Sequence, residues 1–134
     1  MGFLYLLDTN ILSDLIRNPA GKAAQRLAEV GEETICTSIV VACELRFGAE
    51  KKNSDPLRDR VEELLSIVEV FPLDGEVDRK YAKIRTRLEN GGTPIGPNDL
   101  LIAAQALALG LTLVTANIAE FARVPGLHIE NWLA

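Results

Sequence analysis

The chain has 134 residues, with 14 basic and 19 acidic side chains, a formal net charge of −5 and 48% hydrophobic residues. This length predicts one domain spanning residues 1–134, with enough chain to bury a core. The acidic balance disfavours a protein that coats nucleic acid non-specifically, because such proteins are basic. The sequence has no apolar run of about 18 residues, so we expect no membrane span.

Five strand patterns alternate with six helical patterns along the chain. The strands are predicted at residues 3–7, 34–38, 68–73, 112–115 and 127–130. The helices are predicted at residues 10–17, 21–30, 39–52, 56–67, 76–90 and 98–109. This alternation is typical of an α/β fold with a mostly parallel central sheet.

Two polar residues come directly after predicted strands. Asp8 follows the apolar strand 3–7, and Asn117 follows the strand at 112–115. Ligands of parallel sheets bind at the carboxyl ends of the strands. A charge at the end of a buried strand is unfavourable unless something binds it. We therefore expect Asp8 to belong to a site at this edge.

Two more carboxylates lie where they can reach the same edge. Glu44 stands in the apolar stretch SIVVACELRF, and Asp99 stands at the start of an almost wholly apolar helix. Simpler explanations remain open: Asp99 or its neighbour Asn98 can cap the helix, and Asn117 can cap a turn. One turn after Asn117, Glu120 either approaches the same edge or faces solvent.

Converging carboxylates repel one another, and their pKa values rise unless a cation offsets the charge. Their oxygens suit a hard cation, Mg²⁺ or Mn²⁺. Such an ion activates water and stabilises the transition state of phosphodiester hydrolysis. The only histidine, His128, and the lack of a glycine-rich phosphate loop disfavour histidine-pair ribonuclease, serine-triad and ATP-driven chemistry.

Four segments in order resemble the PIN-domain family, and more narrowly the VapC-type toxins of bacterial toxin–antitoxin pairs. They are LLDTNIL, TSIVVACELRFGAEK, GTPIGPNDLLIAAQALALG and TLVTANIAEFARVPGLHIENW. The resemblance implies an α/β/α sandwich and a Mg²⁺- or Mn²⁺-dependent endoribonuclease that cuts structured RNA such as tRNA. It assigns Asp8, Glu44 and Asp99 as metal-binding catalytic acids. It places Asn117 where many relatives have a fourth acid.

The resemblance also assigns small hydroxyl positions of the pocket to Ser38 and Thr115. We expect Asn10 to cap the helix that begins at Ile11. The implied partners are a VapB-type antitoxin, which contacts operator DNA, and a second copy of the chain in a homodimer. We expect the antitoxin tail to pack against residues 10–17 and 56–67, where apolar side chains are available: Leu15, Ile16, Leu64 and Leu65.

Cysteine usage and the N-terminus indicate a cytoplasmic protein. Cys36 and Cys43 fit reduced, buried thiols better than a disulfide or a metal site. The N-terminal apolar stretch lacks basic residues before it and breaks at Asp8, unlike a secretion signal.

Two alternatives to a ribonuclease remain. A haloacid-dehalogenase-like phosphatase would use Asp8 as a nucleophile, but it needs a second Asp two residues later, where this chain has Asn10. A catalytically weakened PIN-like binding module is favoured by Asn117 and disfavoured by the three intact acids.

A basic stretch stands apart from these acids. From Arg79 to Arg87 there are five basic residues and no acidic one, and Arg79, Lys83 and Arg87 share one helical face. This face is either simply solvated or binds phosphates or a partner.

Overall fold

The computed structural model describes residues 2–134 and confirms the α/β fold. Its five strands form one sheet in the order β3-β2-β1-β4-β5, and every pair of neighbours is parallel. The strands are shorter than the sequence patterns that predicted them. Their bounds are β1 Tyr5–Leu7, β2 Ile35–Ser38, β3 Glu69–Phe71, β4 Thr112–Val114 and β5 Ile129–Glu130.

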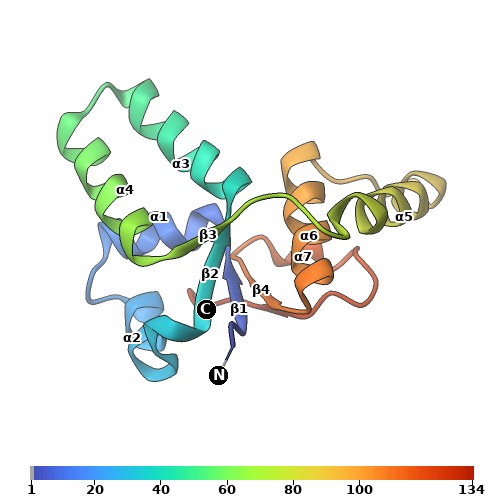
Figure 1. Ribbon diagram of the computed structural model, residues 1–134, viewed down its shortest axis with the longest axis horizontal. Helices are drawn as coiled ribbons and strands as arrows, with labels where there is room; N and C mark the ends of the chain where they lie inside the picture. The colour runs from blue at the N-terminus through green and yellow to red at the C-terminus, as the bar shows by residue number, and fades with distance from the viewer. Residues whose placement is uncertain (1) are drawn as a thin grey trace.

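All six predicted helices are present, with boundaries that differ by a residue. The sequence patterns did not predict the short helix α7 or the 3₁₀ turn at Glu32–Thr34. The helices are α1 Thr9–Arg17, α2 Lys22–Val30, α3 Ile39–Lys52, α4 Asp55–Ile67, α5 Val77–Asn90, α6 Pro97–Leu109 and α7 Ile118–Phe121. Figure 1 shows α1 to α4 on one side of the strands and α5 to α7 on the other. The order β3-β2-β1-β4-β5 puts β1 in the centre, so Asp8 leaves the sheet between the two layers.

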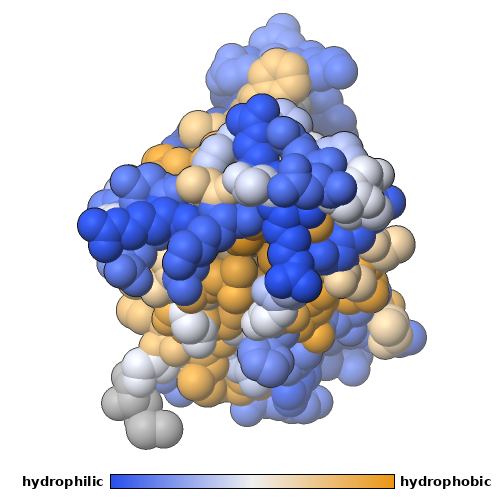
Figure 2. Space-filling model, turned by 90° about the vertical axis from the view of Figure 1, so that its right-hand side faces the viewer, coloured by the Kyte–Doolittle hydropathy of each residue, from blue (hydrophilic) through white to orange (hydrophobic). Residues whose placement is uncertain are grey.

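Helix α5 projects from the α6 side of the molecule as an arm (Figure 1). It buries Val77, Ile84 and Leu88, while most of its other side chains are exposed. Figure 2, which faces this side, shows a broad band of hydrophilic side chains above a hydrophobic area. Helix α5 is therefore attached along one narrow apolar face and leaves the rest in solvent.

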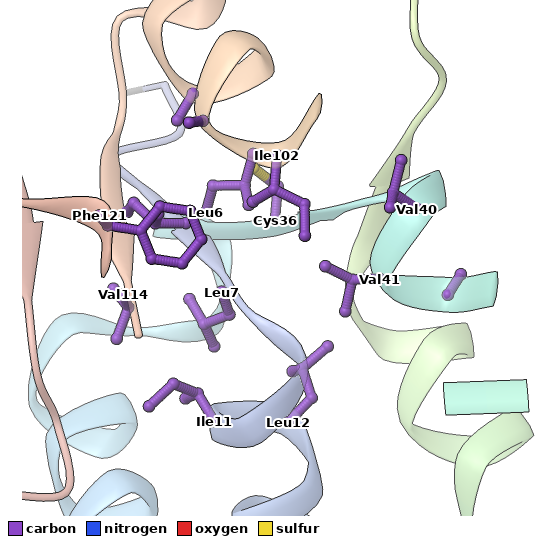
Figure 3. Close-up of a cluster of buried hydrophobic side chains, with 14 of the residues drawn as sticks. Leu6, Leu7, Ile11, Leu12, Cys36, Val40, Val41, Ile102, Val114 and Phe121 are labelled. Carbon is purple, nitrogen blue, oxygen red and sulfur yellow. The ribbon is translucent and has the colours of Figure 1, made fainter. Parts of the chain in front are cut away.

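The core surrounds β1. Leu6 and Leu7 are fully buried, and Figure 3 shows side chains of α1, β2, α3, α6, β4 and α7 gathered around them. Helix α6 is apolar almost all round, as expected of a buried helix. Its only polar side chain after the first turn, Gln105, is 1% exposed and donates from Nε2 to the carbonyl oxygens of Phe71 and Pro72. These bonds tie α6 to the end of β3.

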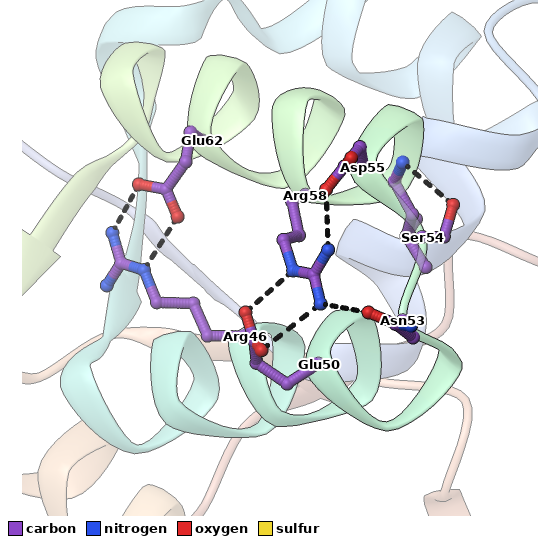
Figure 4. A network of polar contacts seen from close by, with 8 residues as sticks. Arg46, Glu50, Asn53, Ser54, Asp55, Arg58 and Glu62 are labelled. Carbon is purple, nitrogen blue, oxygen red and sulfur yellow. Dashed lines mark hydrogen bonds and ion pairs between the residues drawn. The ribbon is translucent and has the colours of Figure 1, made fainter.

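Helices α3 and α4 form a hairpin held by charged contacts (Figure 4). Arg46 donates two hydrogen bonds to the Glu62 carboxylate at 2.9 and 2.8 Å. Arg58 contacts Glu50 at 2.7 Å and Asp55 at 2.6 Å. The arginines of the hairpin are therefore paired with carboxylates of the same hairpin.

Two expectations from the sequence were wrong. Cys36 is buried, but Cys43 is exposed, because it lies on the solvent side of α3. Asn10 does not cap a helix: α1 already begins at Thr9, and Asp8 is its N-cap. The Asn10 side chain instead accepts a hydrogen bond from the backbone N–H of Ala116 at 3.1 Å and so joins α1 to the chain after β4. None of the helices within residues 2–134 has the length and hydropathy of a membrane span.

Candidate active site

Asp8 lies at the carboxyl end of β1 and is 5% exposed. Its Oδ1 accepts a hydrogen bond from the Thr9 N–H, and its Oδ2 accepts one from the Thr115 hydroxyl, both at 2.8 Å. Burial raises the pKa of Asp8, although these two hydrogen bonds favour the charged form, and the charges of Glu44 and Glu120 raise it further. Asp8 is thus a buried carboxylate held by two neutral donors.

Glu44 approaches the same place from α3. It is half-buried, and its Oε1 accepts a hydrogen bond from the Thr9 hydroxyl at 2.7 Å. Thr9 therefore bridges the two acids, because its backbone N–H binds Asp8 while its hydroxyl binds Glu44. Glu44 therefore lies close to Asp8, although its neighbours in the sequence are mostly apolar.

Asp99 and Glu120 form the second half of the site. Asp99 lies in the first turn of α6, and its carboxyl group and that of Glu120 of α7 both lie beside Gly96. Burial, the adjoining carboxyl group of Glu120 and the nearby charges of Asp8 and Glu44 raise the pKa of Asp99 to about 8. The neighbouring Asp99 lowers the pKa of Glu120, so the pair retains a proton to a higher pH than an isolated carboxyl group would. Gly96 is the N-cap of α6, so neither Asn98 nor Asp99 caps it.

Glu120 is a site residue for which the sequence left two alternatives open. The backbone N–H of Gly96 donates to its Oε1 at 2.8 Å, and the side-chain amide of Asn117 donates to its Oε2 at 2.5 Å. It faces the other acids because α7 turns it back toward α6. A four-residue helix has too short a pattern to be recognised in the sequence, which is why this position was not assigned.

Asn117 is exposed, and Glu120 is the only one of the four acids that it contacts directly in residues 2–134. Besides its bond to Glu120, its backbone N–H donates to the Thr115 hydroxyl at 3.0 Å. Thr115 in turn donates to Asp8, so these bonds connect both halves of the site. Ser38 is fully buried and caps α3, since its hydroxyl accepts from the Val40 N–H at 3.0 Å.

We call Asp8, Glu44, Asp99 and Glu120 the acid cluster. Its donors are hard oxygens, which suit Mg²⁺ or Mn²⁺, and burial is the largest cause of the raised pKa values of Asp8 and Asp99. Within residues 2–134, no group of three or more Asp, Glu, His or Cys side chains is already arranged to hold a metal ion. The carboxylates are instead hydrogen-bonded to Thr9, Thr115, Gly96 and Asn117.

A groove of about 240 Å³ opens beside Glu44, between α1, α3 and α4. Apolar side chains line most of it, including Ile16, Leu45, Leu57 and Val61. Lys52 and Arg17 also line it. Of the four apolar residues that the sequence offered for a partner here, Ile16 lines the groove, whereas Leu65 is buried in the core.

The PIN domain family model matches residues 5–127. The chain is 38% identical over 131 residues to Ribonuclease VapC2 of Rickettsia felis, covering 96% of this chain and 98% of that relative. It is 37% identical over 130 residues to the tRNA(fMet)-specific endonuclease VapC of Salmonella typhimurium, covering 96% and 97%.

A solved structure agrees with these relatives. The crystal structure of VapBC2 from Rickettsia felis, bound to a DNA fragment from their promoter, matches with a TM-score of 0.90 and 37% identity over 97% of this chain and 99% of that chain. These matches exclude the haloacid-dehalogenase-like phosphatase. The chain therefore belongs to the PIN-domain family and, within it, to the VapC ribonucleases.

Proposed function

We propose that this chain is the toxin of a VapBC-type toxin–antitoxin pair and acts as a Mg²⁺- or Mn²⁺-dependent endoribonuclease. Its substrate class is structured RNA, with tRNA as the first candidate, because a relative 37% identical over nearly the full chain is named as a tRNA(fMet)-specific endonuclease. The observation that carries the proposal is the acid cluster, in which Thr9 joins Asp8 to Glu44 and Gly96 lies beside both Asp99 and Glu120.

Asp8, Glu44 and Asp99 would hold the ion, and Glu120 would supply the fourth acid in place of Asn117. When bound, the ion lowers the pKa of water and stabilises negative charge on the phosphate. Thr9 and Thr115 orient Glu44 and Asp8 through hydrogen bonds of 2.7 and 2.8 Å. The proton that the Asp99–Glu120 pair retains must leave before both groups can bind a cation as anions.

The groove between α1, α3 and α4 is the proposed site for the antitoxin tail. Its apolar lining would bury apolar side chains of the tail, and it opens next to Glu44. A basic side chain of the tail placed at the acid cluster would compete with the metal ion for the carboxylates.

The wider assembly follows the same relatives. The similar structures include VapBC2 from Rickettsia felis bound to a promoter DNA fragment and DNA-bound VapBC from Salmonella typhimurium. We propose a VapB-type antitoxin for this chain, operator contact through that antitoxin, a homodimeric toxin and a cytoplasmic location. The net charge of −5 supports operator contact through the partner rather than through this chain.

Cleavage of total tRNA by the purified chain tests the enzyme. We expect cleavage with Mg²⁺ or Mn²⁺, none in EDTA, and little with Ca²⁺, whose longer and looser coordination misplaces the attacking water. Full cleavage in EDTA, or no cleavage by folded protein with either ion, would contradict the proposal.

Expression in bacteria tests the toxin role. Expressed alone, the chain should stop growth, and co-expression of its antitoxin should restore it. The Asp8→Asn protein should be harmless yet still bind the antitoxin, because most of the groove lies outside the acid cluster. Normal growth with soluble, folded wild-type protein would argue against a toxin and leave the nuclease intact.

A further inference from the structure

Helix α5 concentrates positive charge in an acidic protein. Residues 77–90 carry five basic and two acidic side chains, a net charge of +3, while the rest of the chain carries −8. One of the five, Arg85, is paired with Glu89 at 2.7 Å. The free positive charge therefore lies on the remaining basic residues of the arm.

Arg79, Lys83 and Arg87 form a row along the outward face of α5. They are four residues apart, all are exposed, and the buried side chains Ile84 and Leu88 lie on a different face. Throughout the described part of the chain, no carboxylate lies within ion-pair distance of Lys83 or Arg87, and Arg79 reaches Glu76 only at 3.8 Å. Among residues 2–134, Lys83 and Arg87 thus have no ion-pair partner, and Arg79 has one exposed partner.

Helix stability alone does not account for this row. Like charges four residues apart repel and destabilise a helix. Arg87 in the last turn is favourable to the helix dipole, but Arg79 near the first turn opposes it. A bound anion would offset both effects.

The arm is connected to the acid cluster through residues 91–97. The Thr93 N–H donates to the Leu88 carbonyl of α5 at 2.9 Å, and Arg123 donates to the Pro94 carbonyl at 3.0 Å. Two residues later, the Gly96 N–H binds Glu120. This short segment therefore joins the arm to part of the acid cluster.

We propose that α5 is a docking arm for the RNA substrate, with Arg79, Lys83 and Arg87 bound to phosphates remote from the bond that is cut. The proposal rests on the proposed function, because it names where the same RNA is held. Successive members of the row are about 6 Å apart along the helix, a regular repeat that suits the regular phosphates of an RNA strand.

An acidic protein partner fits this face less well than RNA. Protein interfaces centre on apolar or aromatic anchors. The residues that line an open depression together with Lys83 and Arg87 are Ala82, Thr86 and Asn90, which are small or polar. Phosphate binding needs only the cations.

The test compares two double variants with the same change of charge. Lys83→Gln/Arg87→Gln removes two members of the row, and Lys22→Gln/Lys51→Gln removes two exposed lysines from α2 and the end of α3. Binding of a tRNA transcript is measured in the Asp8→Asn background at several salt concentrations. Cleavage kinetics are measured in the otherwise unchanged chain.

We expect the row variant to bind tRNA at least about tenfold more weakly at low salt. Its slope of log affinity against log salt should fall by about 1.4–1.8, since each lost phosphate contact removes about 0.7–0.9. KM should rise by the same factor while kcat changes less than about twofold, because the row does not touch the reacting atoms. The Lys22/Lys51 control should match the wild type in both measurements.

The other outcomes separate the two proposals. If the wild type neither binds nor cleaves RNA, the proposed function fails and the docking arm fails with it. If the wild type cleaves tRNA but the row variant keeps its salt slope and KM, the docking arm alone is wrong. Weaker antitoxin binding with unchanged RNA binding would make this face a protein interface and would equally overturn it.

Discussion

The α3–α4 hairpin and the acid cluster both hold several carboxylates, but their surroundings act on them in opposite directions. In the hairpin, hydrogen bonds from Arg58 and Arg46 lower the pKa values of Glu50 and Glu62. In the acid cluster, burial raises the pKa values of Asp8 and Asp99. The hairpin carboxylates are exposed and paired, whereas the cluster carboxylates are more buried and have only neutral donors or other acids as partners.

The two regions therefore differ in how their carboxylates are accommodated, by arginine partners in the hairpin and by neutral hydrogen-bond donors in the acid cluster. Each carboxylate in these hairpin contacts is paired with an arginine of a neighbouring turn or helix, as Figure 4 shows. The acid cluster keeps its negative charges near one another without such a partner, which disfavours the metal-free state. A cation would remove that penalty, so the two regions should respond differently to mutation, pH and metal.

The largest effect should come from Asp8→Asn, which should abolish RNA cleavage while the fold remains intact. Asp8 is the most buried of the four acids, and burial is the largest cause of its raised pKa. The neutral variant should therefore be at least as stable as the metal-free wild type. Cleavage assays and thermal unfolding in EDTA check this; a folded Asp8→Asn protein with unchanged cleavage would remove the basis for the metal site.

Glu44→Gln and Asp99→Asn should each lower the cleavage rate by at least about a hundredfold, because each removes an anion that would hold the ion. Single-turnover rates at saturating Mg²⁺ measure the effect. Rates within about threefold of the wild type would show that the site is centred on other residues.

Glu120→Gln should impair cleavage more than Asn117→Ala. Glu120 supplies a charge, whereas Asn117 only orients Glu120 through one hydrogen bond. Loss of the Asn117 side chain should therefore reduce the cleavage rate by about tenfold or less. Asn117→Asp replaces the amide donor with an anion beside Glu120. That variant should lower the melting temperature in EDTA and regain it in Mg²⁺. A larger loss in Asn117→Ala than in Glu120→Gln would reverse these roles.

The stability of the metal-free protein should fall as pH rises from about 4 to about 8. Asp99 has a raised pKa in the folded state, so the folded protein binds more protons than the unfolded chain in this window and loses stability as they dissociate. The lowered pKa of Glu120 acts in the opposite direction, but only at lower pH. Melting temperatures in EDTA at several pH values measure the slope, and Asp99→Asn should flatten it. An equally steep slope in Asp99→Asn would assign the titration to another group.

The smallest effect should come from the hairpin. Arg46→Gln breaks the exposed pair with Glu62 and should change the melting temperature only slightly, since solvent screens such pairs. RNA cleavage should stay at the wild-type rate. A loss of cleavage comparable to that of Glu44→Gln would mean that the hairpin and the acid cluster are not independent.

The sequence predicted the parts of this protein that depend on local pattern. Apolar periodicity placed every strand and every long helix, and the polar residues after strands located the edge where the acids lie. The buried position of α6 also followed from its composition, because a helix that is apolar all round has no face for solvent. Asp8 was identified as the polar residue after a strand, and Glu44 and Asp99 by their apolar surroundings, whereas their assignment as metal-binding catalytic acids came from the family resemblance and stays a prediction.

Tertiary structure decided which partner each polar side chain has. Thr115 binds Asp8 across a separation of 107 residues, and the Asp99–Glu120 pair depends on how α7 packs beside α6. The exposure of Cys43 and the capping of α1 by Asp8 rather than Asn10 were decided in the same way. Hydrogen bonds and desolvation depend on distances of a few ångströms between elements, whereas periodicity specifies only which side of an element is apolar. The sequence therefore indicated the edge at which the acids would gather, and only the packed fold determined which neighbours each of them has.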